Sequence, residues 1–333
     1  MLPEIAAQAD DELGVLSSTL PVVDLAHSVR IDQPAIDRTA DRLAREATKP
    51  AEWDSEHHFV DRSSARGQER TAQYVLVLDA LNFCFWGEPR WQVEHRGAWI
   101  NGYFALAVAL RRAVDERVPI LDARYLAELT LDQLSGVLRG RGEVPMLAAR
   151  LASLREVGRR LLTDYNGQFV NVVATADNDA VALVHLLARD FSSFNDVTHY
   201  AGREVRLYKR AQICAADLNS ALAGAGPGRL TSLANLTAFA DYKVPQVLRR
   251  LGILAYAAPL ASRLAARELI PAGDPDEVEI RAATVWAVEL LRLALAARGR
   301  ELTAIQIDWL LWSLGQEPAP EDQPYHLTRT IYY

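Results

Sequence analysis

The sequence contains little cysteine and no long uncharged apolar run. Among its 333 residues only Cys84 and Cys214 are cysteines, and they stand far apart in separate apolar segments. Two cysteines cannot build a disulfide framework or a zinc site of four thiolates, so we expect buried free thiols in a reducing compartment. A membrane-spanning helix needs about 18 or more consecutive apolar residues, and no such stretch occurs. We therefore expect no contact with a membrane.

The sequence also lacks an excess of positive charge. It has 36 Lys and Arg against 43 Asp and Glu, which gives a formal net charge of −7. Proteins that follow the phosphates of a nucleic acid carry a basic surface. The acidic balance therefore argues against a nucleic-acid polymer as partner. It leaves room for one small phosphorylated ligand, which needs only a few local cations.

The N-terminal segment lacks the basic region of a signal or transit peptide. Met1 to Leu20 carries Glu4, Asp10, Asp11 and Glu12 but no lysine or arginine. A targeting peptide has the opposite charge pattern. We therefore expect a soluble cytoplasmic protein.

Several catalytic motifs are missing as well. The chain has no glycine-rich phosphate loop, no GxSxG elbow and no HExxH pair, which argues against kinases, P-loop proteins, α/β-hydrolases and zinc proteases. The tandem His57 and His58 have no third or fourth ligand nearby in the sequence. We predict neither a bound metal nor a cofactor.

What the sequence does contain is helical periodicity. Apolar residues recur every three or four positions from Leu147 to Leu162, as on one face of an amphipathic helix. The same pattern covers Ala180–Arg189, Lys209–Leu222 and Ala282–Ala297. We predict a mostly α protein, with residues 1–333 forming one large helical domain, or two lobes with the active site between them.

Local signals mark some element ends. Thr130–Gln133 and Thr303–Gln306 are capping-box patterns, and Asp274 precedes a proline suited to a first helical turn. Alternating strand patterns are scarce. Residues 74–78 and 171–175 are the best candidates for short strands.

Two segments combine aromatic, amide and ionic residues. Asp79–Trp86 holds Asn82 among Phe83, Phe85 and Trp86, which suits a stacking platform for a flat heterocycle but equally an aromatic core. Asp190–Asp196 places two acids and two phenylalanines in a loop, which suits either a ligand rim or a capped turn.

Two further segments carry charges next to helices. Lys209 and Arg210 open an apolar helix that also contains Asp217; there they could hold a phosphate or form an exposed basic turn. Asp241 precedes a short helix that ends near Gly252. It is an N-cap candidate, and its apolar surroundings also suit a desolvated carboxylate that stabilises a developing cation in glycosidic cleavage.

Four strings together resemble the queuosine salvage protein family. They are Leu81–Trp86, Tyr208–Ile213, Leu236–Tyr242 with Pro245-Gln246, and Glu277–Arg281. The resemblance implies a mostly helical queuosine 5′-phosphate N-glycosylase that releases queuine. The family is distantly similar to helix-hairpin-helix DNA glycosylases, and the match of residues 240–252 to the stretch with their catalytic aspartate gives Asp241 that role.

The resemblance also implies a binding site for queuosine 5′-monophosphate. Asp241 would stabilise an oxocarbenium-like ribose and activate water, while a proton for the leaving base would come from Asp190, Asp196 or Asp217. The remaining substrate-binding candidates are aromatic or amide residues toward the base and donors toward the phosphate: Asn82, Phe83, Phe85, Trp86, Tyr242, Gln246, Lys209, Arg281, His326 and Arg329.

Two other functions remain open. A base-excision glycosylase on a nucleic-acid polymer would need a basic groove, which the net charge of −7 disfavours. A non-enzymatic helical module would use the aromatic cluster to bind a partner. We predict a small-molecule nucleotide as the ligand. The sequence does not indicate an oligomeric state.

Overall fold

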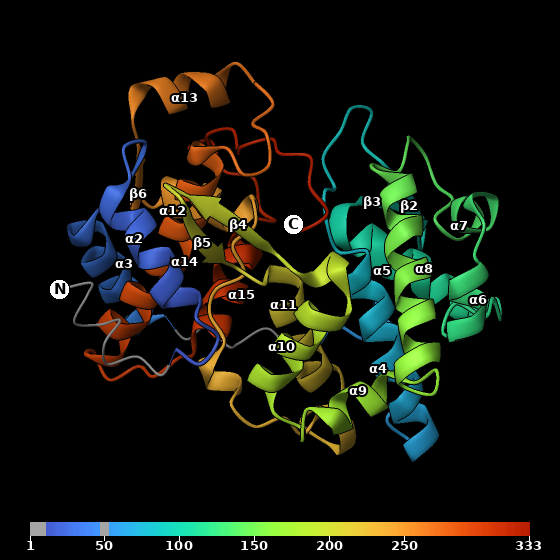
Figure 1. Ribbon diagram of the computed structural model, residues 1–333. Coiled ribbons are helices and arrows are strands. Elements are labelled where there is room, and N and C mark those ends of the chain that lie inside the picture. The colour runs from blue at the N-terminus through green and yellow to red at the C-terminus, as the bar shows by residue number, and fades with distance from the viewer. Residues whose placement is uncertain (1–10, 47–52) are drawn as a thin grey trace. The chain divides into compact units, whose positions relative to one another are not determined.

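The computed structural model describes residues 11–46 and 53–333, so the first ten residues of the segment examined for targeting lie outside it. The described part is mostly helical: it contains 14 α-helices, and helix accounts for 55 % of it against 9 % strand (Figure 1). The predicted fold class is therefore confirmed. None of the described helices is both long and apolar enough to cross a bilayer.

The helices begin where the sequence supplies caps. Both capping boxes form, at Thr130 and Thr303, and the Asp274 side chain accepts the backbone N–H of Asp276. The helices are α2 Val15–Leu25, α3 Gln33–Arg45, α4 Ala65–Ala80, α5 Gly102–Asp115, α6 Ala123–Glu128, α7 Leu131–Val137, α8 Leu147–Asp164, α9 Phe169–Thr175, α10 Ala180–Asp190, α11 Lys209–Ala221, α12 Lys243–Arg250, α13 Ala258–Ala265, α14 Pro275–Ala296 and α15 Ala304–Leu314.

The strands form three antiparallel pairs. They are β1 Val29–Ile31 with β6 Leu254–Tyr256, β2 Gln92–His95 with β3 Ala98–Asn101, and β4 Val197–Tyr200 with β5 Arg203–Arg206. The strands predicted at residues 74–78 and 171–175 are wrong, because these residues lie in α4 and α9. Every residue from Tyr74 to Leu78 is fully buried, so the apolar run reflects a helix surrounded by protein on all sides.

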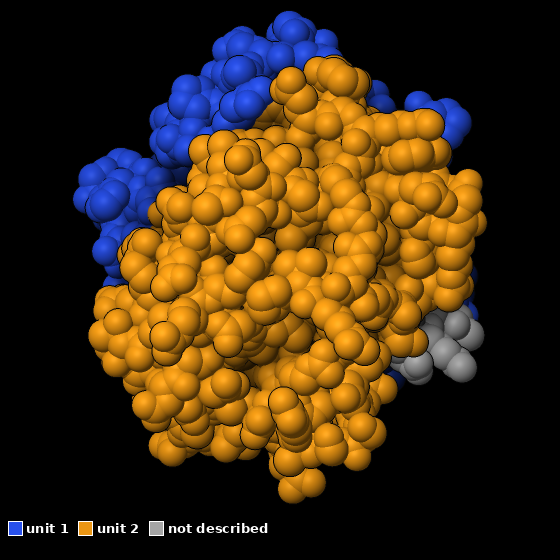
Figure 2. Space-filling view, turned by 90° about the vertical axis from the view of Figure 1, so that its right-hand side faces the viewer, with its two compact units in different colours: residues 1–51, 196–209, 234–329 blue, residues 52–195, 210–233, 330–333 orange. Residues whose placement is uncertain are grey.

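The chain divides into two compact units, each built from segments that are not contiguous in the sequence (Figure 2). Unit 1 comprises residues 1–51, 196–209 and 234–329, and unit 2 comprises residues 52–195, 210–233 and 330–333. The two predicted arrangements, one large helical domain or two lobes with the active site between them, stay predictions.

In unit 1 the central element is α14, whose side chains are buried along most of its length. It packs against α2, α3, α12 and α15. Apolar residues of α3, α12, α14 and α15 contribute to one core cluster that includes Ile36, Val247, Ala287 and Leu311. This core fixes the elements on either side of the segment that carries Asp241.

In unit 2 the long helix α4 contacts α5, α8 and α9. Helix α8 also crosses α6 at Gly158, where a Cβ atom would lie 2.3 Å from the backbone nitrogen of Ala127. Only a glycine allows these two backbones to approach so closely.

Candidate active site

Asp241 of unit 1 caps a helix from a buried position. Its Oδ1 accepts the backbone N–H groups of Lys243 and Val244, both at 2.8 Å, at the start of α12. The residue is only 8 % exposed, and this burial raises the pKa of its carboxyl, while the charge of Lys209 acts in the opposite direction. Asp241 thus binds the first N–H groups of α12 from the position before the N-cap residue Tyr242, and its carboxyl group is also buried.

A second buried carboxyl, Asp308 of α15, was missed by the sequence reasoning. Its Oδ1 accepts the backbone N–H of Phe239 at 2.9 Å, and only 2 % of the residue is exposed. Burial, and after it the negative charge of Asp241, raises the pKa of Asp308 well above its ordinary value. The available signal was an acidic residue within the otherwise apolar run Ile307–Leu311 of a capped helix.

The two carboxyls oppose each other's ionisation and therefore titrate as a pair. Asp241 accepts two backbone N–H groups and Asp308 accepts one, and the charge of Lys209 lowers the pKa of both carboxyls. Asp241 thus accepts more hydrogen bonds that favour its ionised form than Asp308 does, although burial raises the pKa of both carboxyls.

Lys209 is the cation that acts on both carboxyls. It is 5 % exposed, and its charge lowers the pKa of Asp241 and of Asp308 against the effect of burial. Lys209 was predicted to hold a phosphate at the start of a helix, but its backbone N–H donates to Asp196 Oδ2 at 3.1 Å. The phosphate contact of the Lys209 side chain stays a prediction.

Arg210 does not form the exposed basic turn that was one interpretation of the sequence. The residue is 1 % exposed, within unit 2, and its guanidinium donates to the backbone oxygens of Asp79, Ala80 and Ser193. An arginine committed to three carbonyl oxygens stabilises the fold.

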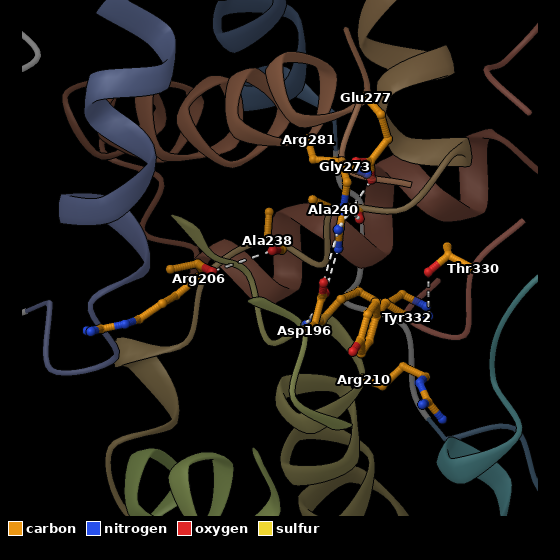
Figure 3. A network of polar contacts seen from close by, with 12 residues as sticks. Asp196, Arg206, Arg210, Ala238, Ala240, Gly273, Glu277, Arg281, Thr330 and Tyr332 are labelled. Atoms are coloured by element: carbon orange, nitrogen blue, oxygen red, sulfur yellow. Dashed lines mark hydrogen bonds and ion pairs between the residues drawn. The ribbon is translucent and has the colours of Figure 1, made fainter. Parts of the chain in front are cut away.

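Arg281 and Asp196 form a buried ion pair in unit 1, shown in Figure 3. Arg281 Nη1 lies 3.0 Å from Asp196 Oδ1, and Nη2 lies 2.5 Å from Oδ2. Arg281 Nε donates to the backbone oxygen of Ala240 at 3.0 Å, and Nη1 is also 3.4 Å from Glu277 Oε1. Arg281 and Asp196 thus bind each other in the folded protein. Their contacts with the substrate stay predictions.

His326 is buried near Arg281. Burial, together with the Arg281 charge, lowers the pKa of His326 to about 3, so the ring is neutral at pH 7. A neutral imidazole can donate one hydrogen bond, but it adds no charge to a phosphate site. The nearby Arg329 is exposed.

Tyr242 and Gln246 lie on a mixed aromatic and cationic surface of unit 1. The rings of Tyr242 and Tyr325 are 4.9 Å apart, and Lys243 Nζ lies 5.6 Å from the Tyr325 ring centre. Lys243 Nζ also donates to Gln246 Oε1 at 3.0 Å. This surface combines a flat apolar face with a cation.

The aromatic candidates belong to unit 2. Phe83 is 1 % exposed and lies between two guanidiniums, with Arg150 at 4.5 Å and Arg210 at 5.0 Å from its ring centre. Trp86 is buried, Phe85 is partly exposed, and Asn82 Nδ2 donates to Asp79 Oδ1 at 3.2 Å. Phe83 is therefore a core residue held by cation–π contacts.

The acids proposed as proton donors fall in different environments. Asp190 of unit 2 bonds to Arg189 and to the Tyr165 hydroxyl, and the Arg189 contact lowers the pKa of Asp190. A carboxyl kept ionised is poorly suited to protonate a base. Asp217 is buried in unit 2, and Asp196 is committed to Arg281.

The histidine pair has protein partners. His57 Nδ1 bonds to Asp54, and His58 Nε2 lies 2.9 Å from the Tyr103 hydroxyl. Throughout residues 11–46 and 53–333, no cluster of three or more His, Cys, Asp or Glu side chains is placed to hold a metal ion.

A mostly helical chain with a buried carboxyl group under the electrostatic influence of a lysine has features expected of a hydrolase of N-glycosidic bonds. Comparison with known proteins agrees. Residues 62–333 match the family described as queuosine salvage protein. The chain belongs to this family, which confirms the resemblance seen in the four sequence strings.

Relatives in several organisms share one name, queuosine 5′-phosphate N-glycosylase/hydrolase. The protein of that name from Sphaerobacter thermophilus is 51 % identical over 98 % of this chain and 100 % of its own length. Those from Bos taurus and Mus musculus are 37 % and 35 % identical, each over 94 % of this chain and 96 % of their own. The predicted enzyme class, hydrolysis of an N-glycosidic bond, is confirmed at the level of the family.

Proposed function

We propose that this chain hydrolyses the N-glycosidic bond of queuosine 5′-phosphate, with water adding to C1′ to give queuine and ribose 5-phosphate. Two findings support this function: full-length similarity to relatives named for it, and the buried carboxyl pair beside a lysine. The observation that carries the mechanism is the burial of Asp241 at the start of α12.

In this mechanism Asp241 acts while the bond to the base breaks. Positive charge develops on the ribose, and a carboxylate in a water-poor setting stabilises that charge more strongly than one in bulk water. The same carboxylate orients the attacking water and accepts its proton. Because its two backbone N–H bonds hold Oδ1 in place, little reorganisation is needed as the charge appears.

The leaving base needs stabilisation of its own. Queuine is a 7-deazaguanine and has no N7 to accept a proton, so the negative charge must be relieved elsewhere on the base. Burial raises the pKa of Asp308 well above its ordinary value, which favours the protonated carboxyl. We therefore propose Asp308 as the source of that proton in place of Asp190.

Substrate contacts complete the proposal. In unit 1 we assign Lys209 to the 5′-phosphate, and Tyr242 with Gln246 to the remainder of the nucleotide. The base contacts of Asn82, Phe83, Phe85, Trp86 and Asp217 stay predictions, as do the contacts of His326 and Arg329 with the phosphate.

The test is chromatographic detection of free queuine after incubation with queuosine 5′-monophosphate, unphosphorylated queuosine or guanosine monophosphate. We expect release from the queuosine nucleotide. The variant Asp241→Asn keeps an oxygen for the two N–H groups of α12 but loses the charge, so turnover should nearly disappear while binding persists. Asp32→Asn is the matched control, because Asp32 caps α3 in the same unit through one Oδ1 bond.

The outcomes separate the alternatives. Absence of queuine with folded wild-type protein would overturn the proposed activity and favour a binding module. Normal turnover by Asp241→Asn would remove Asp241 from the mechanism. Tight oligonucleotide binding that weakens steeply with salt would instead support action on a polymer.

A further inference from the structure

We propose that the Asp196–Arg281 ion pair is a positioning device that sets the catalytic geometry between Lys209 and Asp241. The pair joins residues 85 positions apart in the sequence, yet each partner also holds the backbone next to one of the two functional side chains. Neither partner needs to touch the substrate. This inference rests on the proposed function of the same site.

The arginine holds the Asp241 side of the site. Arg281 Nε donates to the backbone oxygen of Ala240, the residue directly before Asp241, at 3.0 Å. The guanidinium is planar, so an Nε bond in one direction and a two-pronged bond to Asp196 in another fix its orientation. Figure 3 shows Arg281 reaching both Ala240 and Asp196 from α14.

The aspartate holds the Lys209 side. Its backbone oxygen accepts the N–H groups of Leu207 at 3.0 Å and of Tyr208 at 3.2 Å, and its Oδ2 accepts that of Lys209 at 3.1 Å. Tyr208 has a φ of 49°, a left-handed conformation that a bulky side chain rarely adopts. Asp196 thus stabilises a strained turn whose last residue is Lys209.

The consequence is mechanical. Asp196 binds the backbone N–H of Lys209, and Arg281 binds the backbone oxygen of Ala240. The two hydrogen bonds between Arg281 and Asp196 therefore connect these two backbone positions. A shift of this pair therefore changes the separation of the Lys209 ammonium from the Asp241 carboxylate. A misplacement of about 1 Å in a catalytic group can lower a rate about 100-fold.

A third group makes the proposal testable in a folded protein. Glu277 is buried, lies 3.4 Å from Arg281 Nη1, and accepts the backbone N–H of Gly273 at 3.0 Å. In Asp196→Asn the arginine therefore retains a carboxylate partner. The asparagine side chain can still accept the backbone N–H of Lys209. It lacks the negative charge that holds Nη1 and Nη2 of Arg281.

The experiment compares Asp196→Asn and Arg281→Lys with wild type in kcat, KM and the pH dependence of kcat. The matched control is Glu289→Gln, which removes the charge of a buried glutamate of α14 that pairs with the partly exposed Arg292. We expect kcat to fall about 100-fold in both test variants with KM within about threefold, and little change in the control. The acidic limb of the pH profile should also move upward, because Asp241 loses part of the influence of Lys209.

The other results overturn the proposal. An unchanged kcat per folded molecule would mean that the pair serves stability only. A large rise in KM for queuosine 5′-monophosphate, absent with unphosphorylated queuosine, would mean that Arg281 binds the phosphate directly.

Failure of the proposed function gives a different result. Wild-type protein would then release no queuine. The positioning role can still be tested by titrating Asp241 and monitoring the carbon-13 chemical shift of its labelled carboxyl group. An unchanged titration in Asp196→Asn would overturn the positioning role, and an upward shift would support it without reference to turnover.

Discussion

Asp308 and Phe239 stand 69 positions apart in the sequence, yet Asp308 Oδ1 accepts the backbone N–H of Phe239 at 2.9 Å. Phe239 is two residues before Asp241, so this bond attaches the segment that carries Asp241 to α15. The carboxyl that makes the bond is buried and therefore favours its protonated form. The hydrogen bond that holds this segment is therefore made by a titratable group, and its strength depends on pH.

The first prediction concerns Asp308→Asn and stability. The folded-state pKa of Asp308 is raised above 3.8, so the native protein keeps a proton that the unfolded chain releases. Stability contributed by this group is complete below pH 3.8 and is lost as pH rises toward the folded-state pKa, by about 1.4 kcal/mol per pH unit. Asparagine cannot ionise, so the variant should gain stability relative to wild type over a pH range that begins near pH 4.

The measurement is chemical denaturation of both proteins across that pH range. Asparagine keeps the acceptor for Phe239, so the two should be similar at the acidic end. A stability difference independent of pH would show that Asp308 is ionised in the native state. Turnover should fall in the same variant, because the proposed proton source is gone.

The second prediction concerns His326→Gln, where the sign is opposite. The folded-state pKa of His326 is lowered to about 3 from 6.5, so below pH 6.5 the unfolded chain gains a proton that the native state refuses. Wild-type stability should therefore fall as pH decreases toward 3, by about 1.4 kcal/mol per pH unit from this group. His326→Gln should remove that part of the acid sensitivity.

Urea denaturation between about pH 4 and pH 7 provides the measurement. The matched control is His199→Gln, which changes an exposed histidine of β4 in the same unit. If both variants respond to pH in the same way, burial of His326 does not control its protonation.

Local features of this fold could be predicted from the sequence, because their causes are local. The capping boxes at Thr130 and Thr303, the cap at Asp274 and the helix from Leu147 each depend on residues within one or two turns. Residues 74–78 were predicted wrongly for the same reason. A short apolar run has no period of its own, and only its surroundings decide between a buried helix and a strand.

The site was harder to predict, because its partners are distant in the sequence. Asp241 could be proposed from its neighbours and from a family resemblance. In the sequence Asp308 is only an acidic residue in an apolar helix, and the fold shows that it binds the backbone of Phe239. Arg281 and Asp196 have the chemistry of phosphate and base contacts. Only their three-dimensional partners show that they bind each other.

The third prediction tests the crossing of α6 and α8. A Cβ on Gly158 would lie 2.3 Å from Ala127 N and 2.5 Å from Ala123 O, backbone atoms that cannot rotate away. Gly158→Ala should therefore destabilise the protein by about 2 kcal/mol, the typical cost of overpacking. Gly136→Ala in α7 is the control: a Cβ there meets nothing within 4 Å.

The control should change stability in the opposite direction. Alanine in an open helical position is more favourable than glycine by about 0.5–1 kcal/mol. Thermal unfolding of the two variants should thus bracket the wild type. Equal effects of both substitutions would contradict a close backbone crossing at Gly158.

The last prediction distinguishes two roles of Lys209. If its charge acts on Asp241, Lys209→Met should raise the pKa of Asp241 and move the acidic limb of the rate profile upward for every substrate, since Lys209 is the largest charge that lowers this pKa. Lys243→Met is the matched control, because Lys243 has the same effect to a smaller extent. If Lys209 instead only holds the 5′-phosphate, the profile should keep its shape while KM rises for the phosphorylated substrate alone. A lysine with both roles should show both changes, and the difference between phosphorylated and unphosphorylated queuosine then separates the phosphate contact from the influence on Asp241.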